Sequence, residues 1–227
     1  MGRFCYATCE GEINMSDKEI KKEVIIAPPN FETIKAGIAG DTKLVIHKFS
    51  QKARESIKQK QMLGSVGKKG QKREPKDFNA LYEGALYVSS DGWYGFPATA
   101  IRKAMVSACK LVGFHMTKGK LGIFVEADGF DVTSGTPLIK ITKGKPYPHE
   151  DYVRLETGVC DICVRPMWDE GWEATVRIRY DADMFSSQDV LNLLHRAGLQ
   201  VGVCEGRPDS KDSCGCGWGT FRVKSGA

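Results

Sequence analysis

The chain has 227 residues, of which 41% are hydrophobic, and a formal charge of +5. A chain of this length and composition is expected to bury one full hydrophobic core, so we predict a single domain. No apolar run approaches the roughly eighteen residues of a membrane helix, and the N-terminus lacks a secretion-signal pattern, which argues against membrane and exported proteins and predicts a cytoplasmic one.

The first half of the chain predicts two strands, a basic arm, a hairpin and a core helix. Residues 1–23 are expected to form a flexible extension, and residues 24–227 the domain. The segment FETIKAGIAGDTKLVIHKF predicts two strands that meet at Gly40-Asp41, and an arm of residues 50–78 begins with a weakly amphipathic helix over 51–63. Residues 80–97 predict a hairpin with its turn at Ser90–Gly92, and residues 98–113 a helix with one apolar face.

The second half predicts mostly strands and one capped helix. Strands are expected within 120–132 and at 137–141, a loop at 142–151, and long alternating strands within 152–168 and 173–185. In the last of these, alternate residues such as Val176 and Ile178 are apolar while Arg177 and Arg179 lie between them, which is typical of a strand with one buried side. A helix over 188–198 that begins after Ser186 or Ser187 and ends at Gly198, a strand over 199–204, a glycine-rich loop and a last strand over 219–223 follow.

This order of elements predicts an α+β fold. Strand, helix, strand, strand, helix, strand is the order of the ferredoxin-like or RRM-like split βαβ plan, in which helices cover one face of an antiparallel sheet. The basic arm and a hairpin excursion are then insertions into this plan. The other face of such a sheet is open and can bind a ligand.

The positive charge is concentrated in the arm. Between Lys48 and Lys76 there are ten Lys or Arg residues and two Glu, so this segment carries +8 while the remainder of the chain carries −3. A charge this uneven within one domain favours a polyanionic partner. A solvated, lysine-rich linker is the alternative.

Eight cysteines are present, and in the cytosol we expect them to be free thiols. Cys160 and Cys163 have the spacing of a zinc-binding pair, and Cys214 with Cys216 offers a second pair. Because residues three apart on a strand point to opposite faces, Cys160 and Cys163 are poorly placed to share a metal. We therefore predict neither a metal site nor a cofactor.

Two segments resemble known proteins. The end of the chain, with its Ser-capped helix, Gly202-Val203-Cys204 and Gly215-Cys216-Gly217-Trp218-Gly219, resembles the terminal unit of the RAMP superfamily of CRISPR-associated proteins. The segment GFPATAIRKAMVSACKLVG is similar to the helix entry of the backbone subunits of CRISPR effector complexes. HKFSQKAR, FVEADGFDV and YDAD also resemble a bacteriophage protein family, which implies expression inside a bacterial host cell.

The resemblance implies a non-enzymatic protein that binds single-stranded RNA or DNA and assembles head to tail along it. Glycines allow backbone amides to approach a phosphate, and aromatic rings can stack on bases. A tight crossover between core strands is the alternative role for the glycines. The predicted nucleic-acid contacts are Lys52, Arg54, Lys58, Lys60, Lys68, Lys69, Lys72 and Arg73 in the arm, Arg102 and Lys103 at the helix entry, and Arg207, Gly215, Gly217 and Trp218 in the loop.

Two other functions remain open. A metal-independent endoribonuclease would use a histidine such as His47 or His195 near the glycine-rich loop, although no catalytic pair is evident from the sequence. A phage protein that mimics a CRISPR subunit would instead bind host or phage proteins and interfere with host complexes. RNA and single-stranded DNA are equally compatible with the sequence.

Overall fold

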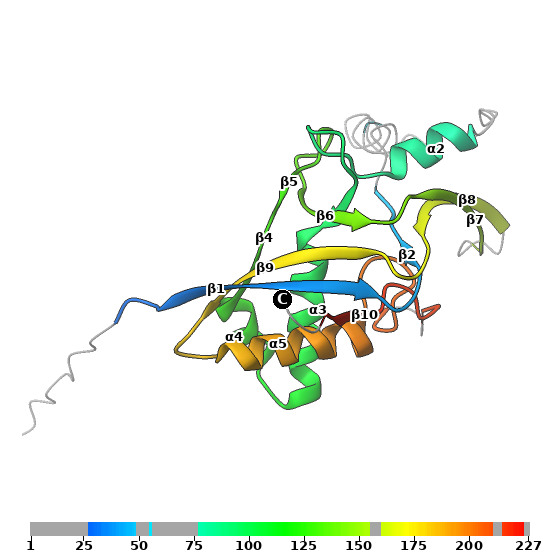
Figure 1. The fold of residues 1–227 in the computed structure, drawn as a ribbon. Coiled ribbons are helices and arrows are strands. Elements are labelled where there is room, and N and C mark those ends of the chain that lie inside the picture. Colours follow the sequence, from blue (N-terminus) through cyan, green and yellow to red (C-terminus); the bar gives the residue numbers. More distant parts are fainter. Residues whose placement is uncertain (1–26, 49–54, 56–76, 155–159, 211–214, 225–227) are drawn as a thin grey trace, which may run out of the picture.

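Two antiparallel sheets and several helices make up the fold (Figure 1). The structure, a computed structural model, describes residues 27–48, 55, 77–154, 160–210 and 215–224. Within them, a seven-stranded sheet has the order β10 (Phe221–Val223), β1 (Phe31–Gly40), β9 (Glu173–Asp181), β6 (Pro137–Lys143) and β3 (Gly95–Pro97), with β4 (Ile123–Glu126) also paired to β9 and β5 (Gly129–Phe130) to β6. A three-stranded sheet has the order β2 (Leu44–Val45), β8 (Cys160–Trp168) and β7 (Tyr147–Arg154). The predicted α+β class is confirmed.

The helices are short and begin at identifiable signals. They are α2 (Phe78–Ala85), α3 (Ala98–Ala108) with the 3₁₀ turn η1 (Cys109–Val112), α4 (Met116–Gly122), and α5 (Ser187–Arg196) with the π-helical turn η2 (Ala197–Val201). Helix α5 begins with a capping box, because Ser186 and Asp189 each accept a hydrogen bond from the other's backbone amide. None of the described helices has the length and apolar character needed to cross a membrane.

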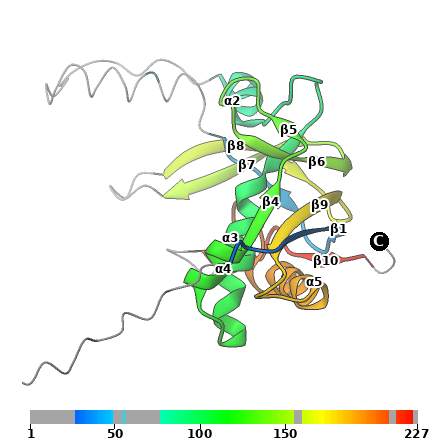
Figure 2. The same ribbon diagram turned by 90° about the vertical axis from the view of Figure 1, so that its left-hand side faces the viewer.

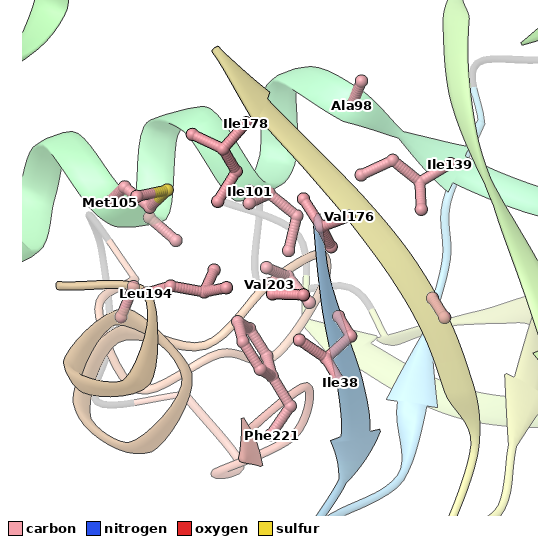
Figure 3. Packing of buried hydrophobic residues seen from close by; sticks show 14 of the residues in the cluster. Ile38, Ala98, Ile101, Met105, Ile139, Val176, Ile178, Leu194, Val203 and Phe221 are labelled. Carbon is pink, nitrogen blue, oxygen red and sulfur yellow. The ribbon is translucent and has the colours of Figure 1, made fainter. Parts of the chain in front are cut away.

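The core lies between the large sheet and the helices α3 and α5. In β9 the apolar residues Ala174, Val176, Ile178 and Tyr180 are buried, whereas Thr175 and Arg179 are exposed and Arg177 is half-buried, as the alternation predicted. Figure 3 shows Ile101 and Met105 of α3 and Leu194 of α5 packed with Val176 and Ile178. Burial of each large apolar side chain contributes about 1.5–3 kcal/mol, so this layer fixes the helices on one face of the sheet.

Two strand–helix–strand segments contribute the centre of the sheet. The first runs from β1 through α3 to β4, and the second from β9 through α5 to β10. Strand β9 pairs with both β1 and β4, and β1 pairs with β10, all in antiparallel register. The spatial order of these four strands is therefore β10, β1, β9 and β4.

The predicted hairpin over 80–97 is wrong in its first half, because residues 78–85 form α2. Asp77 caps this helix, since its carboxylate accepts hydrogen bonds from the amides of Asn79 and Ala80 at 3.0 and 3.1 Å. A short bridge between Val88 and Tyr94 remains, with Gly92 in the turn at φ 78°. The helix α4, which was not predicted, replaces the start of the strand expected within 120–132.

Two other segments also differ from the prediction. Half of the loop expected at 142–151 belongs to β7, which pairs with β8 from Tyr147 to Arg154. The strand expected over 199–204 is absent from the described structure, because η2 continues past Gly198 instead of ending there. Gly198 lies so close to the carbonyl oxygen of Phe221 that a Cβ would collide with it, so the glycine allows close packing and does not end the helix.

Lys48, the first cation of the basic run, is not available to a ligand. Its ammonium group lies 2.7 Å from a carboxylate oxygen of Asp131, and both residues are buried. Asp131 also accepts hydrogen bonds from Val88 and Ser134. Burial alone raises the pKa of Asp131, but the hydrogen bonds from Lys48, Ser134 and Val88 outweigh it and leave that pKa below its usual 3.8. Lys48 thus joins the start of the arm to the β5–β6 turn.

We predict that Lys48→Met lowers the free energy of unfolding by about 3–5 kcal/mol, because it leaves a buried carboxylate without its counter-ion. Urea denaturation at pH 7 measures this change. Lys110→Met is the matched control: Lys110 is exposed on η1 and should change stability by less than about 0.5 kcal/mol. Equal midpoints for the two variants would contradict the structural role of the Lys48–Asp131 pair.

Candidate nucleic-acid interface

Four segments of the chain line one cleft of about 240 Å³. They are the chain just after β2, the chain just after α2, the first turns of α3 and the chain that follows α5. The cleft residues are Ile46, His47, Tyr87, Pro97, Thr99, Ala100, Lys103, Ala104, Val201, Gly202, Val203, Cys204, Glu205, Arg207 and Asp209. The cleft thus brings together the residues that precede the basic arm, the predicted helix entry and the start of the predicted glycine-rich loop.

Backbone hydrogen bonds hold these segments together. The amide of Ile46 donates to the carbonyl oxygen of Pro166 on β8 at 3.1 Å, and the amide of Glu205 donates to that of Val45 at 3.1 Å. The chain before the arm is therefore fixed between the small sheet and the loop. Of the residues that precede the arm, Ile46 and His47 line the cleft.

Charged groups of both signs surround the cleft. Lys103 is exposed on α3, and Arg207 donates to the carbonyl oxygen of Cys204 at 3.0 Å. Glu205 and Asp209 add two carboxylates. Pro97, the N-cap of α3, provides no side-chain hydrogen bond, so the positive end of the helix dipole has no side-chain cap. The cleft can accept an anion near Lys103, while the carboxylate of Asp209 accepts a hydrogen bond from Ser107, one turn further along α3.

The glycine-rich loop is a crossover whose amides are largely used within the protein. The amides of Gly202, Val203, Glu205, Asp209, Cys216, Trp218 and Gly219 all donate to backbone carbonyls. Gly215 has φ 66° and lies against the carbonyl of Arg207, so a Cβ there would collide. The prediction that these amides point at a phosphate is wrong for the residues that donate internally. The alternative role, a tight crossover, fits the loop.

Trp218 has a packing role. Its ring covers Gly206, where a Cβ would contact the indole, and the ring of His149 meets it edge-on with centroids 5.7 Å apart. The indole is half-buried, so it joins the loop to β7. Gly217, which was also predicted to contact nucleic acid, has φ 74° with open space around it.

Arg102 does not line the cleft although Lys103 does. The guanidinium of Arg102 donates to the carbonyl oxygen of Ile123 at 2.8 Å and to that of Lys120 at 2.5 Å, and it lies over the ring of Phe124. These bonds hold α4 and β4 against α3. The structure therefore gives Arg102 a structural role, and it does not support the predicted phosphate contact.

The other predicted cations lie outside the described residues. This group comprises Lys52, Arg54, Lys58, Lys60, Lys68, Lys69, Lys72 and Arg73. Their contacts with nucleic acid stay predictions.

The histidines are separated from one another. His47 lines the cleft, and burial, followed by the charge of Arg165, lowers the pKa of His47 below 6.5 against a smaller opposite effect of Glu205. His195 lies on the exposed side of α5 in a different hollow, where its Nδ1 accepts from the amide of Val223 at 3.5 Å. His47 and His195 therefore do not line a common site.

A metal site finds no support in the described part of the chain. Cys160 and Cys163 lie on the extended strand β8, so they point to opposite faces as expected. Among the described residues there is no group of three or more His, Cys, Asp or Glu side chains that could hold a metal, and Cys214 lies outside them. Cys204 has φ 62°, and its burial raises the pKa of Cys204 to about 12, which disfavours a thiolate.

Sequence reasoning missed a second group of candidate residues on the face of the large sheet opposite to α3 and α5, which we call the uncovered face. Phe31, Phe124 and Arg179 contact one another there. The alternation of β9 predicted that Arg179 lies on this face. The partners from β1 and β4 could not be found without the strand register.

Neither the scan against protein-family models nor the search of curated proteins found a match to this chain.

We predict that Gly219→Ala destabilises the protein far more than Gly217→Ala does. Both residues have positive φ, so either alanine costs about 1–2 kcal/mol, but a Cβ at Gly219 would also collide with the carbonyl oxygen of Val203. Urea denaturation of both variants measures the difference. Similar losses for the two would show that the close crossing of Gly219 and Val203 does not hold the loop.

Proposed function

We propose that the protein is a non-enzymatic, single-stranded nucleic-acid binding protein that takes RNA or single-stranded DNA. The observation that carries the proposal is that the predicted helix entry, the start of the glycine-rich loop and the residues just before the arm line one cleft, with Lys103 and Arg207 among its lining residues. The basic arm of residues 50–78 follows shortly after His47 in sequence and carries nine Lys or Arg against three Asp or Glu, an excess of six positive charges. Phosphate groups along a strand are the polyanion that such a charge distribution suits.

The sheet supports a split βαβ plan. Its central strands have the order β10, β1, β9 and β4, and helices from the two strand–helix–strand segments lie on one face. We propose that this is the ferredoxin-like or RRM-like plan, and that the protein is related in fold to the RAMP superfamily. In this proposal the arm is an insertion within the first half, between β1 and α3, and the segment from β5 to β8 is an insertion between the two halves.

Assembly along the strand is part of the same proposal. The resemblance to CRISPR backbone subunits implies self-association into a head-to-tail filament, with several copies bound to one nucleic acid. Interference with host complexes by contact with host or phage proteins stays a prediction, as does expression inside a bacterial host cell.

We predict that Lys103→Ala combined with alanine at Lys68, Lys69, Lys72 and Arg73 weakens binding to oligo(dT) and oligo(U) strongly. Each lost phosphate contact should lower the slope of log K against log salt concentration by about 0.7, as for single strands. Fluorescence anisotropy between 50 and 200 mM salt measures both quantities. Lys110→Ala, in η1 at the other end of the same helical segment and outside the cleft, is the control. Unchanged affinity and slope in the combined variant would overturn the assignment of the arm and cleft.

A metal-independent endoribonuclease is the second candidate, because His47 lies in the cleft with its pKa lowered, so it is neutral and able to act as a base at pH 7. If RNA is cut, we expect cleavage to persist in excess EDTA, to disappear in His47→Ala and to be retained in His195→Ala. Gel analysis of a labelled RNA checks this. Loss of cleavage in EDTA, or equal activity of His47→Ala and the wild type, would eliminate this candidate.

A further inference from the structure

One face of the large sheet carries no helix among the described residues. Helices α3 and α5 lie on the other face, as Figures 1 and 2 show. The alternation of side chains directs Thr33 and Lys35 of β1 and Thr175, Arg177 and Arg179 of β9 away from those helices. This uncovered face is therefore on the opposite side of the sheet from α3 and the cleft that it lines.

Two phenylalanines and an arginine meet at one end of this face. In the register, Arg179 lies opposite Thr33 of β1 and opposite Phe124 of β4. The rings of Phe31 and Phe124 meet edge to face with centroids 5.7 Å apart, and the guanidinium of Arg179 lies 5.3 Å from each ring centre. Arg102 lies over Phe124 from the side of α3, at 4.9 Å.

This group is accessible. Phe31 exposes 40% of its surface, and Arg179 is exposed. Phe124 beside it is half-buried, and adjoining apolar side chains that stay at the surface can form a binding site. The contact with Arg179 holds the rings in place by cation–π attraction, so the surface is formed before any ligand arrives.

The charges of the uncovered face leave cations for a ligand. Arg177 lies 3.6 Å from a carboxylate oxygen of Glu126 and 3.3 Å from one of Asp128. Lys35 and Arg179, in contrast, have no ion-pair partner within the described part of the chain. A ligand that combines flat aromatic groups with regularly spaced negative charges complements this pattern.

We propose that Phe31, Phe124 and Arg179 form a stacking surface for unpaired nucleobases, with Lys35 and Arg179 placed to contact the flanking phosphates. This inference rests on the proposed function and adds to it a second nucleic-acid binding surface, separate from the cleft. Base stacking needs an exposed ring face, which a base in a duplex does not offer, so the surface selects single strands. A strand that contacts both this surface and the cleft passes around an edge of the sheet.

The test compares an oligonucleotide that has bases with one that has none. Phe31→Ala should weaken binding of oligo(dT) and oligo(U) about 5- to 100-fold, whereas it should not change binding of an abasic oligomer of the same length. Phe130→Ala is the matched control, because this phenylalanine is 61% exposed on β5 outside the surface. Anisotropy at constant salt measures each affinity, and circular dichroism checks that the variants are folded. Arg179→Gln, at an exposed position, is the second variant: it removes a phosphate contact and the cation–π support of both rings, so it should weaken binding of both oligomers, and of the base-bearing one more.

The outcomes separate the two proposals. If wild-type protein binds oligo(dT) and the abasic oligomer equally well and Phe31→Ala has no effect, the stacking surface is wrong and the proposed function stands. If wild-type protein binds neither single strand, the proposed function fails and this inference fails with it. Tighter binding of a duplex than of a single strand would also overturn the stacking surface.

Discussion

The two faces of β9 carry opposite kinds of side chain, and the rest of the molecule is arranged around that division. Ala174, Val176, Ile178 and Tyr180 are buried on the helix side, so α3 and α5 must lie there to remove these residues from water. Arg177 and Arg179 point to the opposite face of the sheet, which no described helix covers. Their charged groups stay hydrated there, whereas burial under the helices would remove that hydration. The alternation of apolar and cationic side chains along β9 therefore explains why one face of the sheet is covered by helices and the other carries exposed cations.

The glycine-rich loop adds a second constraint on the helix-covered side. Its chain crosses close to β2 and Val203, and its internal hydrogen bonds make it a folded segment that forms one wall of the cleft. The cleft and the uncovered sheet face are therefore separate surfaces. A nucleic acid that contacts both the cleft and the uncovered sheet face has to pass around an edge of the sheet, which a flexible single strand can do.

The sequence predicted the elements whose signals are local. The alternation of β9, the Ser186 cap of α5 and the apolar face of α3 are all present as expected. Prediction from the sequence failed where contacts between distant segments determine the secondary structure. Gly198 resembles a helix end, but the close approach of Phe221 requires a glycine within a continuing helical turn. The segment before β8 resembles a loop because of its prolines, yet pairing with β8 makes it a strand.

The candidate sites show the same limit. Lys103 and Arg207, both predicted as nucleic-acid contacts, line one cleft, because an apolar helix face and a crossover both pack on the core; their contacts with nucleic acid stay predictions. The sequence did not reveal that Arg102 donates a hydrogen bond to a backbone carbonyl and that Lys48 pairs with a buried carboxylate, because charge alone does not identify a partner distant in the chain. The cluster of Phe31, Phe124 and Arg179 needs the register of three strands, which no single segment contains.

Ultraviolet crosslinking of the purified full chain to 4-thiouridine RNA and to 5-iodouracil DNA, followed by mass spectrometry of the crosslinked peptides, tests the central claim most directly. The account predicts that single strands crosslink to peptides containing Phe31 or Phe124 and to the basic segment that follows the cleft. Absence of crosslinks at micromolar protein, or crosslinks confined to the helix α5 side of the molecule, would contradict it.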